Sequence, residues 1–299
     1  MTLQQGKMNK IYGLNIDMLR LCFECDNVDL INELITVEVG DSFDCFDFYL
    51  LRIEGKHFEY VFEIRYYECG ESKLYGELRF GINKDETESN IHFNGTRKIW
   101  ISVVNSALYC NEKYYIDYIS DVLSLTLHNI TTFDIAMDMS KNIGQHLKRL
   151  IRNKELTTIL NGKKITDRNE DRPEITYTSS GTLNKDKYMT LNIKQKKAIK
   201  DKSKGTSLIA YDKRTEIINS SHKDYIMELY GNPKKLYRLE VHLNNGDIKE
   251  YVNSKRLELN LNTIFQPHFL YYLFLHTLNS LIRFEYSRNH KLSWEDILS

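Results

Sequence analysis

Hydrophobic and polar residues alternate over short stretches in the first 110 residues, which is the pattern of half-buried β-strands. These stretches are rich in Tyr, Phe, Val and Ile, and residues typical of turns separate them. They run from Phe46 to Ile53, Tyr60 to Tyr67, Leu74 to Phe80 and Lys98 to Val104. We therefore predict an antiparallel sheet in this part of the chain.

Apolar residues three or four positions apart predict helices further along the chain. The predicted helices run from Lys113 to Leu127, from Ile143 to Leu160, and from Ile264 to Tyr286. The last is dense in leucine and aromatic residues, so we expect it to pack in the core, with a homodimer contact as the alternative. Together these patterns indicate an α+β fold of antiparallel β-sheets flanked by helices.

A chain of 299 residues with 41% hydrophobic residues is long enough to bury a sizeable core. We predict an N-terminal β-rich subdomain over residues 1–110 and a catalytic subdomain over residues 111–260. A helical segment over residues 261–299 would follow. No stretch is long and apolar enough to predict a membrane span, and no signal peptide is recognisable, so we expect a cytoplasmic protein.

Charge is segregated along the chain although the formal net charge is zero. Residues 1–140 carry 12 Lys and Arg against 23 Asp and Glu, whereas residues 141–220 carry 19 against 9. The basic segment, residues 141–205, includes a predicted helix with Lys148, Arg149 and Arg152, and a cluster with Lys194, Lys196 and Lys197. Such a segment suits a polyanion such as nucleic acid, with a solvated loop as the alternative.

Three strand patterns carry polar residues on one face. They are Phe133-Asp-Ile-Ala-Met-Asp138, Leu208-Ile-Ala-Tyr-Asp-Lys213 and Leu236-Tyr-Arg-Leu-Glu-Val-His-Leu243. Alternation puts Asp134 and Asp138 on one side of the first strand, and Arg238, Glu240 and His242 together on the third. Burying such acids is costly unless a cation or hydrogen bonds compensate them, so the pattern indicates a site.

The acids are candidate ligands of a divalent cation. Oxygen ligands of Asp134, Asp138 and Glu240 favour Mg²⁺ or Mn²⁺. His242 could join them as a ligand, orient a phosphate or shuttle a proton. Arg238 could contact DNA or pair with an acid inside the sheet.

Tyr211 is a candidate nucleophile beside these acids. A tyrosine hydroxyl has an ordinary pKa of about 10 and needs a base, a cation or a metal-polarised target to react. Lys213 is expected on the same strand face, where its charge would favour the phenolate. Tyr188 and Tyr237 remain alternatives, because the chain contains 20 tyrosines.

The three strand patterns, in this order, resemble those of the Rep_trans family, the replication initiation factors of rolling-circle plasmids and phages, which are related to conjugative relaxases. Asp134-Ile-Ala-Met-Asp138 resembles the acidic strand of the family, and Ile209-Ala-Tyr-Asp-Lys213 with Glu216 resembles its tyrosine strand. Tyr237-Arg-Leu-Glu-Val-His242 resembles its Arg-x-Glu strand. The resemblance covers roughly residues 95–245.

This resemblance implies a nickase that cuts one strand of single-stranded or hairpin DNA at a replication origin. It implies a 5′-phosphotyrosyl link to Tyr211, a 3′-OH that primes synthesis, metal ligands at Asp134, Asp138 and Glu240, and a phosphate contact at Lys213. It also implies a host helicase and a host polymerase as partners. Two alternatives remain: a metal-dependent hydrolytic nuclease in which Tyr211 only packs, and a noncatalytic nucleic-acid-binding protein.

Overall fold

The structure is a computed structural model that describes residues 9–81, 98–165, 174–179, 189–195, 205–286 and 291–299. The chain forms two compact units. Unit 1 contains Met1–Asn15, Asp134–Leu257 and Gln266–Ser299, and unit 2 contains Ile16–Phe133 and Glu258–Phe265. Because these segments interleave, no single boundary near residue 110 or 260 separates the units, and the three-part division stays a prediction.

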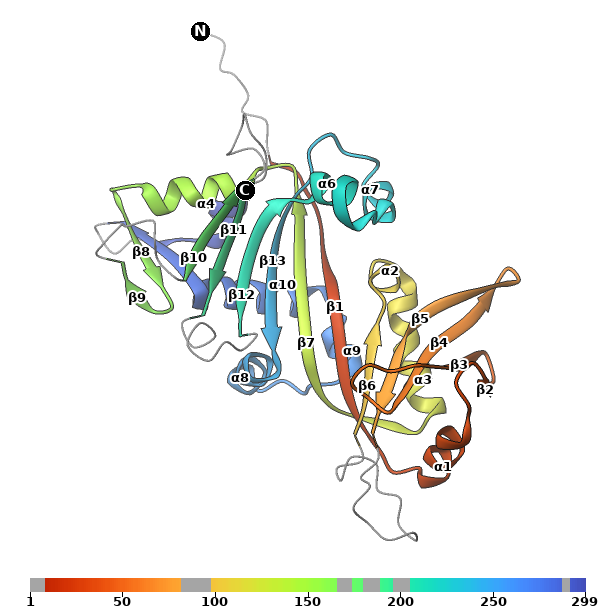
Figure 1. Ribbon diagram of the computed structural model, residues 1–299. Coiled ribbons are helices and arrows are strands. Elements are labelled where there is room, and N and C mark those ends of the chain that lie inside the picture. The colour runs from red at the N-terminus through yellow and green to blue at the C-terminus, as the bar shows by residue number, and fades with distance from the viewer. Residues whose placement is uncertain (1–8, 82–97, 166–173, 180–188, 196–204, 287–290) are drawn as a thin grey trace. The chain divides into compact units, whose positions relative to one another are not determined.

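Unit 1 contains an antiparallel sheet with the strand order β10-β11-β12-β13-β7-β1 (Figure 1). Strands β1 and β7 each contribute one segment to unit 1 and another to unit 2. The strands are β1 (Ile11–Cys25), β7 (Leu125–Met139), β10 (Ile175–Ser179), β11 (Met189–Lys194), β12 (Ser207–Asp212) and β13 (Tyr237–Asn244). Part of the predicted basic segment is therefore sheet.

Helices cover the apolar face of this sheet. They are α4 (Ile143–Arg152), α8 (Asn245–Lys255) and α10 (Pro267–Leu281), which contact β12 or β13. A Cβ added at Gly144 of α4 would lie 3.3 Å from the carbonyl oxygen of Ala210 and 3.6 Å from Met189 Cε. This close approach places α4 on the face that carries the buried Ala210 and Met189.

A second, smaller sheet in unit 1 has the order β15-β14-β8-β9. Its strands are β8 (Leu156–Leu160), β9 (Lys163–Lys164), β14 (Ile282–Tyr286) and β15 (Lys291–Leu292). The remaining helical elements of unit 1 are α6 (Lys213–Glu216), the π-helical turn Ile217–Ser221, α7 (Asp224–Leu229) and α11 (Trp294–Leu298). Two predicted helices were therefore too long, because residues 156–160 and 282–286 pair with each other as β8 and β14.

Unit 2 contains the sheet order β1-β6-β5-β4-β3-β2. The strands after β1 are β2 (Ser42–Cys45), β3 (Phe48–Ile53), β4 (Tyr60–Glu68), β5 (Glu71–Phe80) and β6 (Lys98–Val103). The helical elements are α1 (Val28–Thr36), α2 (Asn105–Leu108), the 3₁₀ turn Asn111–Tyr114, α3 (Tyr115–Val122) and α9 (Leu261–Ile264). The four strands predicted in this region are confirmed.

The predicted helix from Lys113 to Leu127 is wrong at its ends. It starts with the 3₁₀ turn, and Ser124 adopts a left-handed φ of 53° before β7 begins at Leu125. The α+β fold class with large antiparallel sheets flanked by helices is confirmed.

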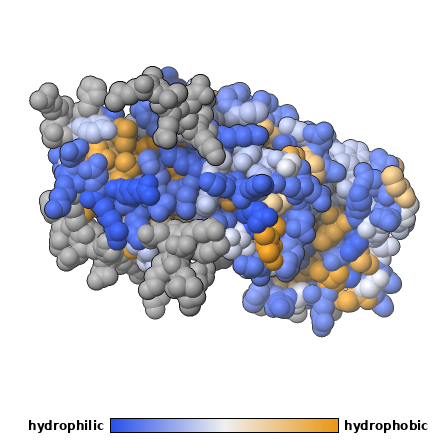
Figure 2. Space-filling view, turned by 90° about the horizontal axis from the view of Figure 1, so that it is seen from above, coloured by the Kyte–Doolittle hydropathy of each residue, from blue (hydrophilic) through white to orange (hydrophobic). Residues whose placement is uncertain are grey.

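The molecular surface in Figure 2 is mostly hydrophilic, with smaller hydrophobic areas between the polar ones. Within the described part of the chain, no helix combines the length and apolar character needed to span a membrane.

Candidate active site

The polar face of the unit 1 sheet gathers most of the predicted site residues. In the register of β12 with β13, Tyr211 lies opposite Arg238, and Ser207 lies opposite His242. Residues directly opposite each other share a face of the sheet, so Tyr211, Glu240 and His242 lie on the side away from Ala210 and α4. The same register extends this face across β10 and β11 to Thr176, Thr178, Thr190, Asn192 and Lys194.

Asp138 and Arg238 form a buried ion pair on this face. Arg238 Nε donates to Asp138 Oδ1 at 2.8 Å, and a terminal guanidinium nitrogen of Arg238 donates to Asp138 Oδ2 at 2.7 Å. Both side chains are 0% exposed. The two-pronged geometry compensates each buried charge, which would otherwise be costly to remove from water. Arg238 therefore pairs with an acid inside the sheet.

Tyr230 and Asn15 extend this ion pair into a network. The hydroxyl of Tyr230 donates to Asp138 Oδ2 at 3.1 Å and accepts from the side-chain amide of Asn15 at 2.7 Å. Burial, followed by the negative charge of Asp138, raises the pKa of Tyr230 well above its ordinary value. Tyr230 therefore keeps its proton, and it serves as a fixed hydrogen-bond donor.

Asp134 and His242 form a second pair across β7 and β13. His242 Nδ1 lies 2.5 Å from Asp134 Oδ1. Asp134 is buried, whereas His242 is partly exposed. The carboxylate fixes the orientation of the imidazole.

Tyr211 and Glu240 form a third pair. The Tyr211 hydroxyl donates to Glu240 Oε2 at 3.0 Å. This distance is within the range required for a general base that removes the proton of a nucleophile. Both side chains are partly exposed, so the hydroxyl is positioned at the surface of the sheet.

Lys213 lies next to Tyr211, although not on the strand face where we predicted it. Strand β12 ends at Asp212, whose side chain accepts from the backbone N–H of Thr215 and caps α6. Lys213 is thus the first residue of α6 and is buried. Its ammonium donates to Glu216 at 2.7 Å and lies 5.8 Å from the centroid of the Tyr211 ring.

The donor set only partly matches the predicted metal site. Among the residues that the structure describes, no group of three His, Cys, Asp or Glu side chains is arranged to hold a metal ion. Both oxygens of Asp138 bind Arg238, while Asp134 is paired with His242 and Glu240 accepts from Tyr211. One or two carboxylates, completed by water and phosphate oxygens, are a common donor set for Mg²⁺, so Asp134 or Glu240 can contribute a single ligand to such an ion without a three-residue site. Metal binding stays a prediction.

The predicted DNA contacts divide between the two faces of the sheet. Lys194 is exposed on the polar face, opposite Ser207. Lys148 belongs to α4, which covers the apolar face, and its ammonium lies 5.3 Å from the ring centroid of Tyr177. Arg149 and Arg152 occupy the last turn of the same helix. Lys196 and Lys197 lie outside the described residues.

The two alternative nucleophiles are less well placed. Tyr237 pairs with Asp212 in the register, so it lies on the face opposite to Glu240. Tyr188 lies outside the described residues. The strand patterns do not indicate Tyr230 or Asn15. Asn15 has a weak signal in the alternation of its strand, whereas a single tyrosine carries none in a chain with 20 of them.

Comparisons with known proteins find a similar solved structure but no matching family model or curated sequence. Among solved structures, the chain is similar to a rolling circle replication initiator protein from Geobacillus stearothermophilus, with a TM-score of 0.44 and 13% sequence identity. The match covers 91% of this chain and 87% of that chain. Membership of the Rep_trans family stays a prediction.

Proposed function

We propose that the protein initiates rolling-circle replication by nicking one DNA strand at an origin, with Tyr211 as the nucleophile. The observation that carries the proposal is the hydrogen bond from the Tyr211 hydroxyl to Glu240 on the polar face of the sheet. The order of the three strand motifs, which resembles that of the Rep_trans family, supports the same function.

The reaction begins when Glu240 accepts the proton of Tyr211. The phenolate oxygen then attacks the phosphorus of one phosphodiester, and an O–P bond forms as the bond between phosphorus and the 3′-oxygen breaks. The departing 3′-oxygen takes a proton from solvent, and Glu240 returns its own proton to solvent. The products are a 5′-phosphotyrosyl adduct and a free 3′-OH, and attack by a 3′-OH on the adduct reverses the reaction.

Lys213 supplies a positive charge next to the reacting groups. Its burial increases the effect of its charge, because neighbouring water does not screen it fully. The charge favours the phenolate over the phenol and stabilises negative charge that develops on the phosphate. Glu216 holds the ammonium in place through its ion pair.

Mg²⁺ or Mn²⁺ would be held through Asp134, completed by water and phosphate oxygens, since Glu240 is assigned as the base. A divalent cation supplies charge neutralisation at the scissile phosphate. In the proposed site Asp138 has a different role, since it fixes Arg238 within the sheet and accepts a hydrogen bond from Tyr230, which follows α7. A host helicase that unwinds the duplex and a host polymerase that extends the 3′-OH are further proposals, supported by the family resemblance alone.

The test uses a set of 3′-labelled single-stranded oligonucleotides that tile the DNA around the gene of this protein, incubated with the full chain and Mg²⁺ or Mn²⁺. A phosphotyrosyl link retains the labelled 3′ portion of the DNA, so a labelled band should migrate with the protein after denaturation. The band should disappear in Tyr211→Phe.

Tyr237→Phe is the matched control, because it removes a tyrosine hydroxyl from the neighbouring strand on the opposite face. It should keep the adduct. An adduct that survives in Tyr211→Phe would assign the reaction to another tyrosine. Cleavage without an adduct would indicate a hydrolytic nuclease, and binding without cleavage of a validated origin would indicate a noncatalytic DNA-binding protein.

A further inference from the structure

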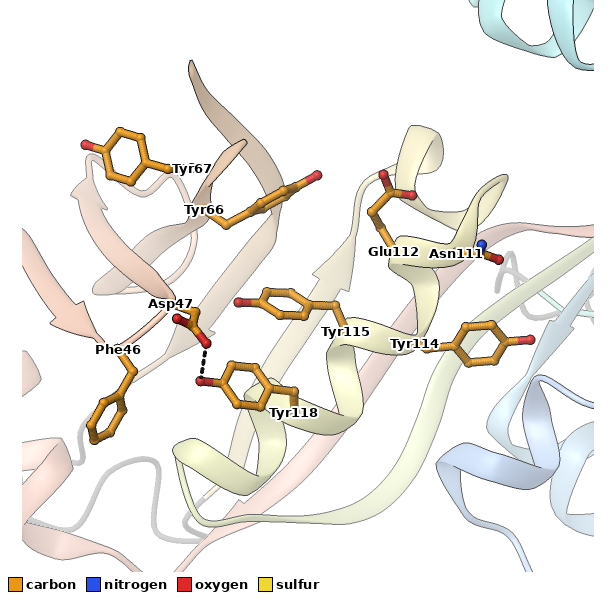
Figure 3. A pocket seen from close by; sticks show the side chains of 9 residues that line it. All are labelled: Phe46, Asp47, Tyr66, Tyr67, Asn111, Glu112, Tyr114, Tyr115 and Tyr118. Carbon is orange, nitrogen blue, oxygen red and sulfur yellow. Dashed lines mark hydrogen bonds between the residues drawn. The ribbon is translucent and has the colours of Figure 1, made fainter. Parts of the chain in front are cut away.

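Unit 2 contains a pocket that the proposed nicking reaction does not use. Its volume is about 760 Å³, and its walls come from the turn before β3, the end of β4, the 3₁₀ turn and α3 (Figure 3). The lining residues are Phe46, Asp47, Tyr66, Tyr67, Asn111, Glu112, Tyr114, Tyr115 and Tyr118. The pocket is therefore mainly aromatic, with two carboxylates.

Three tyrosine rings form the inner wall. The ring centroids of Tyr66 and Tyr115 are 5.8 Å apart, and those of Tyr115 and Tyr118 are 5.2 Å apart. The buried rings of Phe48 and Tyr75 support Tyr115 edge-on from the core. Because these rings brace one another, the wall is fixed before any ligand arrives, which lowers the entropic cost of binding.

The two carboxylates give the pocket its charge. Figure 3 shows the hydroxyl of Tyr118 directed at Asp47, to which it donates at 3.1 Å. The second carboxylate belongs to Glu112, which lies on the 3₁₀ turn close to the thiol of Cys110. The Glu112 side chain as a whole is partly exposed and lines the pocket, so its carboxylate adds a second negative charge there.

The surroundings select against anions. The sequence of unit 2 carries 22 Asp and Glu against 10 Lys and Arg. Burial raises the pKa of Tyr115 to about 12, with Tyr118 and Asp47 contributing, so this ring remains a neutral phenol at neutral pH. A nucleic-acid phosphate would be repelled, whereas a cation would be attracted both by the carboxylates and by the faces of the rings.

We propose that this pocket binds an arginine side chain presented by an arginine-containing peptide stretch of a partner protein. A guanidinium is planar, stacks on tyrosine rings and donates several hydrogen bonds in fixed directions, so it can contact the aromatic wall and a lining carboxylate together. The volume exceeds that of one side chain and accommodates the neighbouring residues of a peptide. At the rim, Phe46 is 93% exposed and offers an apolar contact to such a segment.

The test measures the fluorescence anisotropy of a labelled octapeptide of alternating arginine and glycine, mixed with the full-length protein at physiological salt. A second peptide with citrulline in place of arginine keeps the shape and removes the charge. We expect saturable binding of the arginine peptide, with at least tenfold weaker binding of the citrulline peptide. The Tyr211→Phe protein should bind the arginine peptide as well as wild type, since the pocket does not depend on the nicking site.

Two variants locate the binding. Glu112→Gln and Asp47→Asn should each weaken binding of the arginine peptide about five- to tenfold, whereas Asp117→Asn, an exposed acid on α3 outside the pocket, should leave it unchanged. Asp47 is exposed in a turn, so Asp47→Asn decides the question if Glu112→Gln fails to fold, as judged by circular dichroism.

Three results would overturn the proposal. Equal weakening by Asp117→Asn would indicate a general charge effect. Equal binding of the citrulline peptide would show that the charge of arginine is not recognised. Absence of saturable binding of the arginine peptide would show that the pocket does not bind it. If labelled (dT)₈ binds the protein and Glu112→Gln weakens that binding, the pocket is instead a nucleobase site.

Discussion

At the scale of single residues, the polar face of unit 1 consists of side-chain pairs with different roles. Asp138 and Arg238 are inaccessible to solvent, whereas Tyr211 and Glu240 are partly exposed. The inaccessible pair cannot contact a substrate without rearrangement, so it holds the strands in register. The partly exposed pair can contact DNA.

The buried ion pair makes a prediction about stability. Asp138→Ala leaves the Arg238 charge buried without its partner, and we expect a loss of about 3–5 kcal/mol in the free energy of unfolding of unit 1, measured in urea. Glu77→Ala breaks the partly exposed pair of Glu77 with Arg79 and should cost about 1 kcal/mol or less. Equal losses in the two variants would show that burial does not distinguish these pairs.

The proposed base makes a prediction about activity. Glu240→Gln keeps the size of the side chain but removes the proton acceptor, so the single-turnover rate of adduct formation at pH 7 should fall about 10²–10⁴-fold. The variant rate should then rise with pH, because hydroxide replaces the missing base. If the rate of adduct formation in Glu240→Gln is the same fraction of the wild-type rate at every pH, the role of Glu240 as a base is contradicted.

Alternation in the sequence predicted which of these residues share a face, but not how they pair. Asp134, Asp138, Arg238, Glu240 and His242 were correctly grouped because strand geometry has a period of two. The pairing of Asp138 with Arg238, rather than with a metal ion, depends on the register between β7 and β13, which are about 100 residues apart in the chain. The alternation within one strand fixes its faces, but it does not specify the pairing with a strand so distant in the chain.

At the scale of elements, helix α4 lies close to the sheet because Gly144 has no side chain. Gly144→Val would place methyl groups against Ala210, where even a Cβ would be 3.3 Å from the carbonyl oxygen. We expect a loss of about 1–3 kcal/mol in the free energy of unfolding. Gln145→Val, the neighbouring position on α4, is the control for the helix propensity of valine and should cost less.

The same helix predicts a dependence of stability on pH. Burial, followed by the charges of Lys141 and Arg149, lowers the pKa of His146 to about 4 from an ordinary value of 6.5. The unfolded chain therefore binds a proton at a higher pH than the folded chain, so stability present above pH 6.5 is lost as the pH falls toward 4. Urea midpoints across this range should change less in His146→Gln than in wild type. His268→Gln, an exposed histidine of α10, should behave as wild type.

Helix lengths were the least predictable feature of the fold. Leu156, Ile159 and Leu160 continue the helical spacing of α4, so the sequence predicted one long helix. The structure turns at Asn153 and uses these residues in β8, which pairs with β14 more than 120 residues later. A strand that depends on so distant a partner is determined by tertiary pairing, which local periodicity cannot reveal.

At the scale of the whole molecule, the neutral chain separates into units of opposite charge. The sequence of unit 1 carries 31 Lys and Arg against 19 Asp and Glu, and unit 2 has the reverse imbalance. The segregation of charge along the sequence therefore matches the two units only approximately, because unit 1 combines segments that are far apart in the chain. DNA binding is expected on unit 1, and the proposed cation pocket belongs to unit 2.

The two faces of the unit 1 sheet allow a test of where DNA lies. If single-stranded DNA crosses the polar face, Lys194 contacts a phosphate, and Lys194→Gln should reduce the slope of log affinity for (dT)₂₀ against log salt concentration by about 0.7. Lys148→Gln removes the same charge from α4 on the opposite face and should leave that slope unchanged. Fluorescence anisotropy titrations at several salt concentrations measure both slopes. If Lys148→Gln lowers the slope and Lys194→Gln does not, DNA lies along α4, away from Tyr211, and the proposed nicking site would have to be abandoned.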